Sequence, residues 1–264
     1  MLHDELASAT PKEVREAIRK GSWTKQTGGL ASGFVQANLA ILPSALAYDF
    51  LLFCLRNPKP CPVLDVTDRG SAVPSIVAPS ADLRCDLPKY RVYRKGQLFD
   101  EPNSIEAYWN DDLVCFLLGC SYTFEHAFAR DGIALRHWEQ QRNVAMFRTN
   151  QACRSAGRFH GPLVVSMRPI PADQVARAVN ISGRYASAHG SPVHVGSAES
   201  LGITDVAKPD WGDPVSFLPG DVPVFWACGV TPQAVALEAH LDLMITHAPG
   251  HMFITDVPIT AVEQ

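Results

Sequence analysis

The segment LVCFLLGCSYTFE, residues 113–125, gives the strongest indication of the fold. Its first six residues are continuously apolar, which is typical of a strand buried on both faces, and residues 119–121 then lead into a helical pattern. The same order recurs in VPVFWACGVTPQ, residues 222–233, where Cys228 follows the apolar run and Pro232 favours the start of a helix. Two strand–turn–helix units of this kind predict an α/β fold.

Segments on both sides of these units predict further helices and strands. Residues 10–13, TPKE, combine a capping hydroxyl, a proline and a reciprocal glutamate, so a helix is predicted at 11–20. We interpret the apolar stretch 39–55 as a buried helix, because it is too short and too broken to span a bilayer. Residues 90–99 predict a hairpin. Further strands are expected at 62–66, 73–77, 143–150, 162–169, 192–195, 243–246 and 252–256, and a further helix at 171–178.

The order of these elements predicts the fold class and its division into domains. Strands that alternate with helices are typical of α/β proteins, so we expect a mainly parallel three-layer sandwich. The pattern changes between residues 133 and 199, and there we expect a smaller inserted α+β domain with two layers. The main α/β domain then comprises residues 1–132 and 200–264.

Composition limits the class of partner. The chain has 264 residues, of which 47% are hydrophobic, and its 23 basic and 27 acidic residues are scattered rather than clustered. No electrostatic surface for a nucleic acid or an anionic membrane is therefore expected, and a small anionic substrate is the expected partner. The N-terminus lacks the features of a signal peptide, which favours a cytoplasmic location. Self-association into a homo-oligomer is left open.

The cysteines and histidines are the candidates for chemistry. Seven cysteines with no C-x-x-C pair indicate reduced thiols rather than a disulfide framework. The sequence implies no particular cofactor, and nucleotide binding is not expected because the glycine-rich stretch 27–33 lacks the lysine of a phosphate-binding loop. His247 and His251 are separated by Pro249-Gly250, so they lie on a turn rather than on a helical metalloprotease motif. A divalent metal bound by these two histidines together with His189 and His194 is left open.

Three turns are expected to meet at the carboxyl ends of the strands, where ligands bind in open parallel sheets. Cys120, Cys228, His247 and His251 lie on these turns and are our candidates for acid/base catalysis. A helix that begins after Cys120 or Cys228 would lower the pKa of the thiol beside it. The alternative for both cysteines is a structural role as a small buried residue.

Other residues are candidates for binding the acid group of a substrate. The backbone N–H groups at Ser121 and Thr231 would lie at helix N-termini and favour a carboxylate. Arg148 is preferred to Arg168 as the anchoring guanidinium, and Glu125 is interpreted as complementing a helix dipole. The remaining candidates for substrate binding are Asn150, His189 and His194.

Several stretches resemble one bacterial protein family. They include TGGLASGFVQANLAILP (27–43), FLLGCSYTFE (116–125), VPVFWACGVTPQ (222–233) and ITHAPGHMFITD (245–256). Together with shorter motifs between them, they are similar to the hydro-lyase family also called the YcsI or DUF1445 family, over nearly the whole chain. A related domain occurs in the mitochondrial D-glutamate cyclase of animals. The resemblance implies a two-domain α/β architecture and a carbon–oxygen lyase, and it supplies no catalytic residues.

The expected function is therefore that of a hydro-lyase acting on a small carboxylic or amino acid. Either acid/base elimination or cyclising dehydration needs a base, an acid and fixed donors for the carboxylate. One alternative is a cofactor-free racemase or isomerase, in which Cys120 and Cys228 act on opposite faces of one stereocentre. The other alternative is a module that binds an anionic metabolite without turnover.

Overall fold

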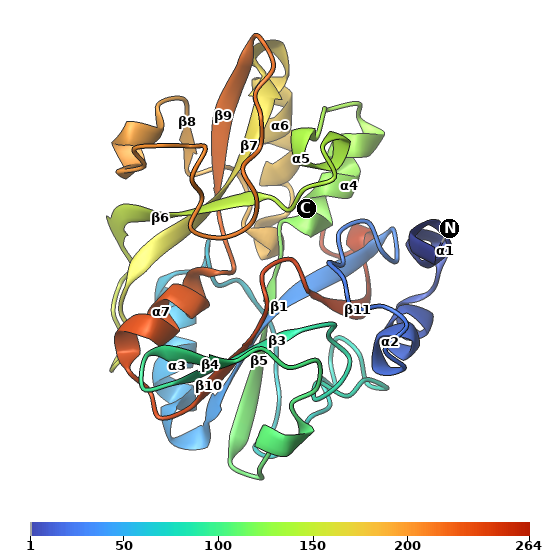
Figure 1. The fold of residues 1–264 in the computed structure, drawn as a ribbon, viewed down its shortest axis with the longest axis vertical. Coiled ribbons are helices and arrows are strands. Elements are labelled where there is room, and N and C mark those ends of the chain that lie inside the picture. Colours follow the sequence, from blue (N-terminus) through green and yellow to red (C-terminus); the bar gives the residue numbers. More distant parts are fainter. Residues whose placement is uncertain (1) are drawn as a thin grey trace.

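The computed structural model describes residues 2–264, and these residues form a mixed α/β fold (Figure 1). The strands are β1 (Phe34–Pro43), β2 (Val63–Val66), β3 (Tyr90–Arg94), β4 (Gln97–Asp100), β5 (Leu113–Gly119), β6 (Ala145–Ala152), β7 (Pro162–Pro171), β8 (His194–Val195), β9 (Asp221–Ala227), β10 (Met244–His247) and β11 (Phe253–Pro258). The α-helices are α1 (Leu2–Ser8), α2 (Pro11–Arg19), α3 (Ser44–Arg56), α4 (Tyr122–Arg130), α5 (Arg136–Glu139), α6 (Val175–Gly183) and α7 (Thr231–Ala239).

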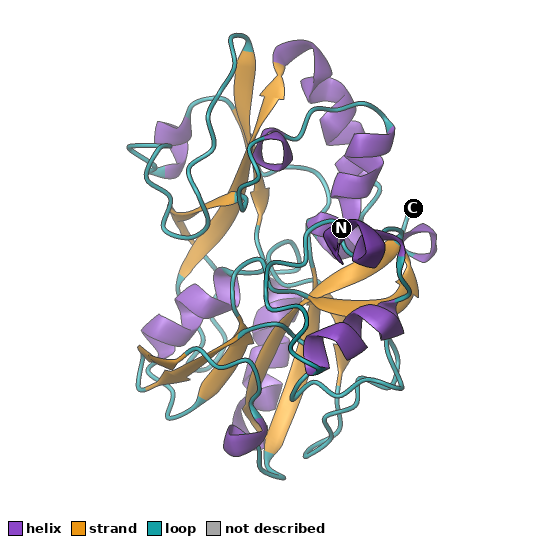
Figure 2. Ribbon diagram, turned by 45° about the vertical axis from the view of Figure 1, so that its right-hand side comes forward, coloured by secondary structure: helices purple, strands orange, loops and turns teal. Residues whose placement is uncertain are grey.

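The strands belong to two separate sheets. The first has seven strands in the order β2-β5-β1-β10-β3-β4, with β11 also paired to β1, and the second has four strands in the order β6-β7-β9-β8. The four-stranded sheet lies in the upper part of the molecule with α5 and α6, and most of the seven-stranded sheet lies in the lower part with α3 (Figures 1 and 2). No helix among residues 2–264 is long and apolar enough to cross a membrane.

The predicted mainly parallel sandwich is wrong, because the paired strands of both sheets run antiparallel. A parallel pair needs a crossover that returns to the same sheet. Here β5 lies in the first sheet and leads through α4 and α5 to β6 in the second. In the other direction, β9 of the second sheet leads through α7 to β10 of the first. Each strand–turn–helix unit therefore carries the chain from one sheet to the other.

The central strand of the first sheet is β1, which pairs with β5, β10 and β11. Its residues are almost entirely buried, so they show no alternation of apolar and polar positions. We predicted a helix over 39–55, but residues 39–43 are the end of β1, and α3 begins directly at Ser44. The strand expected at 73–77 is also absent, and that segment is a turn. The helix expected at 11–20 is confirmed as α2, with the capping box formed by Thr10 and Glu13.

Each sheet is covered by apolar side chains on both faces. Ala40 and Leu42 of β1 pack with α3 and α7, whereas Leu39 and Ile41 face a second cluster formed with the segment between β2 and β5. This alternation follows from the two-residue repeat of a strand. One face of the second sheet packs on α4 and α6 through Trp226 of β9 and its neighbours.

The division into domains stays a prediction, but the second sheet can be compared with it. The expected insert, residues 133–199, contains β6, β7 and β8. The same sheet also includes β9, at Asp221–Ala227, which lies outside that range and pairs with β7 along its whole length. The smaller sheet is therefore built from two stretches of the chain, and the second stretch includes one of the two cysteine-bearing turns.

A close backbone approach makes Gly119 a sensitive position at the end of β5. A Cβ atom on Gly119 would lie 1.6 Å from the carbonyl oxygen of Ser187, so the backbone must move to accept a side chain. We expect Gly119→Ala to lower the free energy of unfolding by about 1–3 kcal/mol or more, as overpacking does. Urea unfolding measures this change. Gly28→Ala is the control, because its Cβ would make only an ordinary contact of 3.7 Å with Tyr122.

Candidate active site

Two turns with the pattern C-x-x-T lie where the chain passes between the two sheets. Cys120 follows β5 and Cys228 follows β9. In each turn the threonine three residues later, Thr123 or Thr231, donates its backbone N–H to the carbonyl oxygen of the cysteine at 3.0 Å. The two cysteines belong to one buried cluster that also contains Tyr122 and Met252. The structure therefore brings together two thiols that are 108 residues apart in the sequence.

The environment of the thiols differs from our expectation. Burial raises the pKa of Cys228 to about 11 and raises the pKa of Cys120 still further. The backbone N–H groups of Tyr122 and Val230 act in the opposite direction, as expected at helix N-termini, but their effect is smaller. The helix N-termini therefore lower the pKa of these thiols as expected, but desolvation of the thiolate outweighs them and the net pKa of each thiol is raised. Both thiols are protonated at neutral pH.

A buried ion pair lies next to the first of these turns. Arg168 of β7 and Glu125 of α4 are both 0% exposed. Arg168 donates from Nε to Glu125 Oε1 at 2.8 Å, and its Nη2 donates to the hydroxyl of Ser121 at 2.9 Å. The guanidinium also lies over the rings of Phe124 and Trp226, at 5.4 Å from each. Because Ser121 follows Cys120 in the chain, this ion pair fixes the turn that holds the first thiol.

The two arginines differ from our expectation in burial, although Arg168 does form the ion pair that was the alternative for it. Arg168, which we took for the less probable anchor, is the buried one. Arg148 is partly exposed, with Nη1 3.8 Å from Glu238 and its guanidinium over the ring of Trp211. Asn150 is exposed and lies against Gly202. Arg148 and Asn150 therefore do not line the cleft described below.

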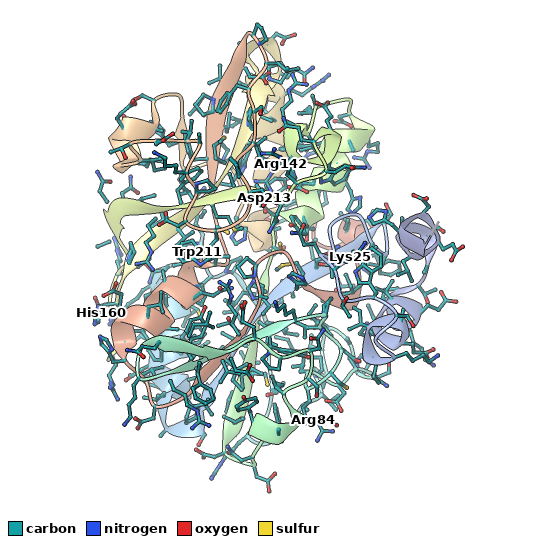
Figure 3. The ribbon with its side chains drawn as sticks, in the orientation of Figure 1. Lys25, Arg84, Arg142, His160, Trp211 and Asp213 are labelled. Atoms are coloured by element: carbon teal, nitrogen blue, oxygen red, sulfur yellow. The ribbon has the colours of Figure 1, made fainter. Side chains whose placement is uncertain are left out.

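A cleft of about 1320 Å³ opens beside these turns. Tyr122 links the two features, because it lines the cleft and also belongs to the cluster of the two thiols. Figure 3 marks two cationic residues of its lining, Lys25 on the loop before β1 and Arg142 on the segment before β6. No partner of the Lys25 ammonium is found in the part of the chain that the structure describes. The polar residues of the lining include Lys25, Tyr122, His126, His137, Arg142 and His251.

His251 is the predicted acid/base residue that lines the cleft. Its Nδ1 lies 3.0 Å from the carbonyl oxygen of Pro249, which places the proton on Nδ1 and leaves the lone pair on Nε2. A backbone hydrogen bond fixes the loop that carries His251, because Thr27 donates its backbone N–H to the carbonyl oxygen of Gly250 at 2.9 Å. Burial lowers the pKa of His251, so its ring is neutral at neutral pH. A neutral ring with a free Nε2 is suited to act as a base.

His247 lies deeper than its neighbour on the same turn. It is 1% exposed at the end of β10, and its Nδ1 is 3.2 Å from the backbone nitrogen of Leu39. Its Nε2 is buried and has no hydrogen-bond partner among the described residues. Burial lowers the pKa of His247 to about 3. The ring is therefore neutral, and it lies outside the lining of the cleft.

The buried His247 should make stability depend on pH. Its pKa is about 3 in the fold against an ordinary value of 6.5, so the unfolded chain takes up the proton first as the pH falls. Stability is complete above pH 6.5 and is lost between pH 6.5 and 3. Between about pH 7 and about pH 5, the charge on His247 in the unfolded chain lowers the free energy of unfolding by about 2 kcal/mol. We expect the His247→Gln variant to lack this contribution to the pH dependence. Urea unfolding at both pH values measures it, with the exposed His160→Gln as control.

The remaining predicted residues have structural contacts. The Thr231 hydroxyl donates to the carbonyl oxygen of Cys228 at 2.7 Å, so it closes its own turn. His189 is buried with Nδ1 2.6 Å from the carbonyl oxygen of Lys59, and burial lowers its pKa to about 4. His194 lies at β8, with Nε2 2.7 Å from the carbonyl oxygen of Ser197. None of these three residues lines the cleft.

Metal ligation can be assessed from the side chains. Within residues 2–264, no group of three or more His, Cys, Asp or Glu side chains is arranged to hold a metal ion. His247 and His251 share a turn, but one is buried and the other lines the cleft. The structure therefore does not bring the four predicted histidines together.

Sequence reasoning missed Asn38 and did not predict the burial of Arg168. Asn38 lies in the middle of β1 and donates from Nδ2 to the carbonyl oxygen of Gly119 at 2.5 Å. A Cβ on Gly229 would lie 2.0 Å from the same Nδ2, so Asn38 touches both cysteine-bearing turns. The signal that could have indicated Asn38 and Arg168 is the same. Each is a polar residue inside an otherwise apolar strand, where a buried polar group needs a partner.

These features define a two-sheet mixed α/β protein with a cleft lined by α4, α5 and the loop before β1. The model of the D-glutamate cyclase family matches residues 114–256, which contain β5 through most of β11, both C-x-x-T turns and His251. The chain belongs to the D-glutamate cyclase family.

Curated relatives agree over nearly the full chain. A protein of Bacillus licheniformis named "Putative hydro-lyase" is 62% identical and the alignment covers 94% of both chains. "Putative hydro-lyase YcsI" of Bacillus subtilis is 55% identical over 94% of this chain and 96% of its own. A nitrogen repressor-like protein of Methanococcus jannaschii, a solved structure, covers 92% of this chain and 97% of its own at 9% identity and a TM-score of 0.37, which is too low to establish a shared fold.

Proposed function

We propose that this protein is a carbon–oxygen lyase that removes water from a small carboxylic or amino acid. The names of its relatives and the description of its family support this class of reaction. The family description favours cyclising dehydration of a glutamate-like acid over simple elimination. In that reaction the amine nitrogen forms a bond to the side-chain carboxyl carbon, and a C–O bond of that carboxyl breaks to release water.

The observation that most supports this proposal is the placement of His251. A ring with a free Nε2 lines the same cleft as the cationic side chains of Lys25 and Arg142 (Figure 3). In the proposed reaction, Nε2 of His251 takes the proton that the substrate loses, from nitrogen in the cyclisation or from carbon in an elimination. Lys25 binds the carboxylate that does not react, because opposite charges attract and the ammonium has no partner in residues 2–264. Such a site requires no bound cofactor for proton transfer.

A turnover experiment tests the proposal. The purified protein is incubated with D-glutamate, L-glutamate or a small hydroxy acid in heavy water, and proton NMR follows the products. We expect a cyclic amide from a glutamate, or an unsaturated acid from a hydroxy acid, at a rate that Lys25→Met reduces through a higher KM. Binding of these acids without any product would contradict the proposal and favour a binding module.

A second candidate is cofactor-free racemisation by Cys120 and Cys228. The shared cluster of the two thiols favours it, since two-base chemistry needs two thiols at one centre. Their raised pKa values oppose it, because one thiol must be a thiolate. Deuterium uptake at the α-carbon that is lost in Cys120→Ala would support racemisation. Cys115→Ala is the matched control, because Cys115 is equally buried but lies in another core cluster.

A further inference from the structure

A second histidine of the cleft lies beside a buried carboxylate. His137 is on α5, is 2% exposed and lines the cleft. Its Nε2 is 3.1 Å from Oε1 of Glu125. Glu125 therefore supplies a charged partner to Nε2, whereas Nδ1 has no polar partner in the described part of the chain. No periodic pattern or motif in the sequence indicates this residue.

The carboxylate of Glu125 is fixed and ionised. Oε1 accepts from Nε of Arg168 at 2.8 Å, and Oε2 accepts from Nε1 of Trp138 at 3.0 Å. Burial disfavours the charge, but Arg168 and His137 outweigh it, and the pKa of Glu125 is lowered to about 2. Glu125 therefore presents a permanent negative charge to the imidazole ring of His137.

The buried Nδ1 of His137 has no partner, and this calls for an explanation. A buried polar nitrogen without a partner costs about 1–3 kcal/mol, and such groups are rare in native proteins. His189, by contrast, has a partner in the carbonyl oxygen of Lys59 and lies outside the cleft. His137 instead lies in the wall of a cleft, where a bound molecule can supply the partner.

We propose that His137 is a catalytic residue, the acid that donates a proton to the departing oxygen of the substrate, with Glu125 as its positioning residue. This inference rests on the proposed dehydration and names its second proton-transfer group. His251 takes one proton as the new bond forms, and His137 gives one proton to the hydroxyl as the C–O bond breaks, which yields water. The proton on His251 then returns to His137 through solvent, so both rings are restored.

The ionised Glu125 explains why this ring can act as the acid. An adjacent carboxylate compensates the positive charge of an imidazolium and fixes the orientation of the ring. His251 has no carboxylate partner, so the two histidines differ in the charge that lies beside them. The assignment of roles therefore follows from the two environments rather than from residue type.

Steady-state kinetics of His137→Gln tests the inference. We expect kcat to fall by about 10²–10⁴-fold while KM stays within about threefold, because the proton is transferred only in the transition state. Added imidazole should restore part of the kcat of His137→Gly, which a merely structural role would not allow. The exposed His160→Gln should keep the activity of the original protein.

The outcomes separate this inference from the proposed function. An active protein whose His137→Gln variant keeps kcat within about threefold would overturn the role of His137 and leave the lyase intact. Absence of turnover with every small acid would contradict the proposed lyase function itself. In that case, or if the variants fail to fold, hydrogen exchange at Cε1 of each histidine is measured on the unsubstituted protein with excess glutarate. Slower exchange at His137 but not at His160 would support its contact with an acid ligand, and unchanged exchange would overturn it.

Discussion

Replacing Glu125 with glutamine should lower the free energy of unfolding by about 3–5 kcal/mol, because it leaves the guanidinium of Arg168 charged and buried without its partner. Both side chains are 0% exposed, so water cannot compensate. The Arg168 side chain would keep its bonds to the hydroxyls of Ser121 and Ser166, which do not carry charge. Urea unfolding followed by circular dichroism measures the change.

The pH dependence of the original protein gives an independent check on the same pair. The pKa of Glu125 is lowered from 4.5 to about 2 in the fold. Its contribution to stability is therefore present above pH 4.5 and is lost as the pH falls from 4.5 towards 2.

Glu139→Gln is the control for the Glu125→Gln substitution, because Glu139 pairs with Arg136 at 3.1 Å but is half exposed, and such pairs contribute little. Equal losses in the two variants would contradict the special position of Glu125.

The elements were predictable where local pattern decides them. The strands around β5 and β9 and the helices that follow them are confirmed, because buried apolar runs and turn residues are short-range signals. The end of β1 was assigned to a helix because the strand runs into α3 without a loop, so residues 39–55 form one apolar stretch. The predicted parallel strand direction was wrong for another reason. After each strand–turn–helix unit the chain passes to the other sheet, and no local sequence pattern indicates this change.

The candidate site was predictable only in part, for the same reason. Local turn chemistry was enough to indicate His251, because Pro249-Gly250 forces a loop that presents it. The Glu125–Arg168 pair joins residues 43 apart in two different elements, so neither residue alone indicates the other. The same limit applies to His137, whose importance comes from a carboxylate on another helix. Long-range pairs of this kind become visible only when the fold is known.

Replacing His251 with glutamine should lower kcat by about 10²–10⁴-fold, the usual contribution of one acid/base group. Folding should be little affected, because the ring makes one hydrogen bond, to the carbonyl oxygen of Pro249, on a loop that Thr27 holds independently. Steady-state kinetics by NMR with the best substrate of the screen gives both kcat and KM.

The pH profile of the unsubstituted protein distinguishes a base from a binding group at the same position. Burial lowers the pKa of His251, so the neutral base persists below the ordinary value of 6.5, and kcat/KM should fall only as the pH drops through that lowered value. The His251→Gln variant should lose this acid limb along with its rate. If it instead raises KM and retains kcat, then His251 binds the substrate without taking its proton, and the base must be sought elsewhere along the cleft. That result would leave the role of His137 as the acid to be judged by its own kinetics, because the two rings lie on different elements and contact different partners.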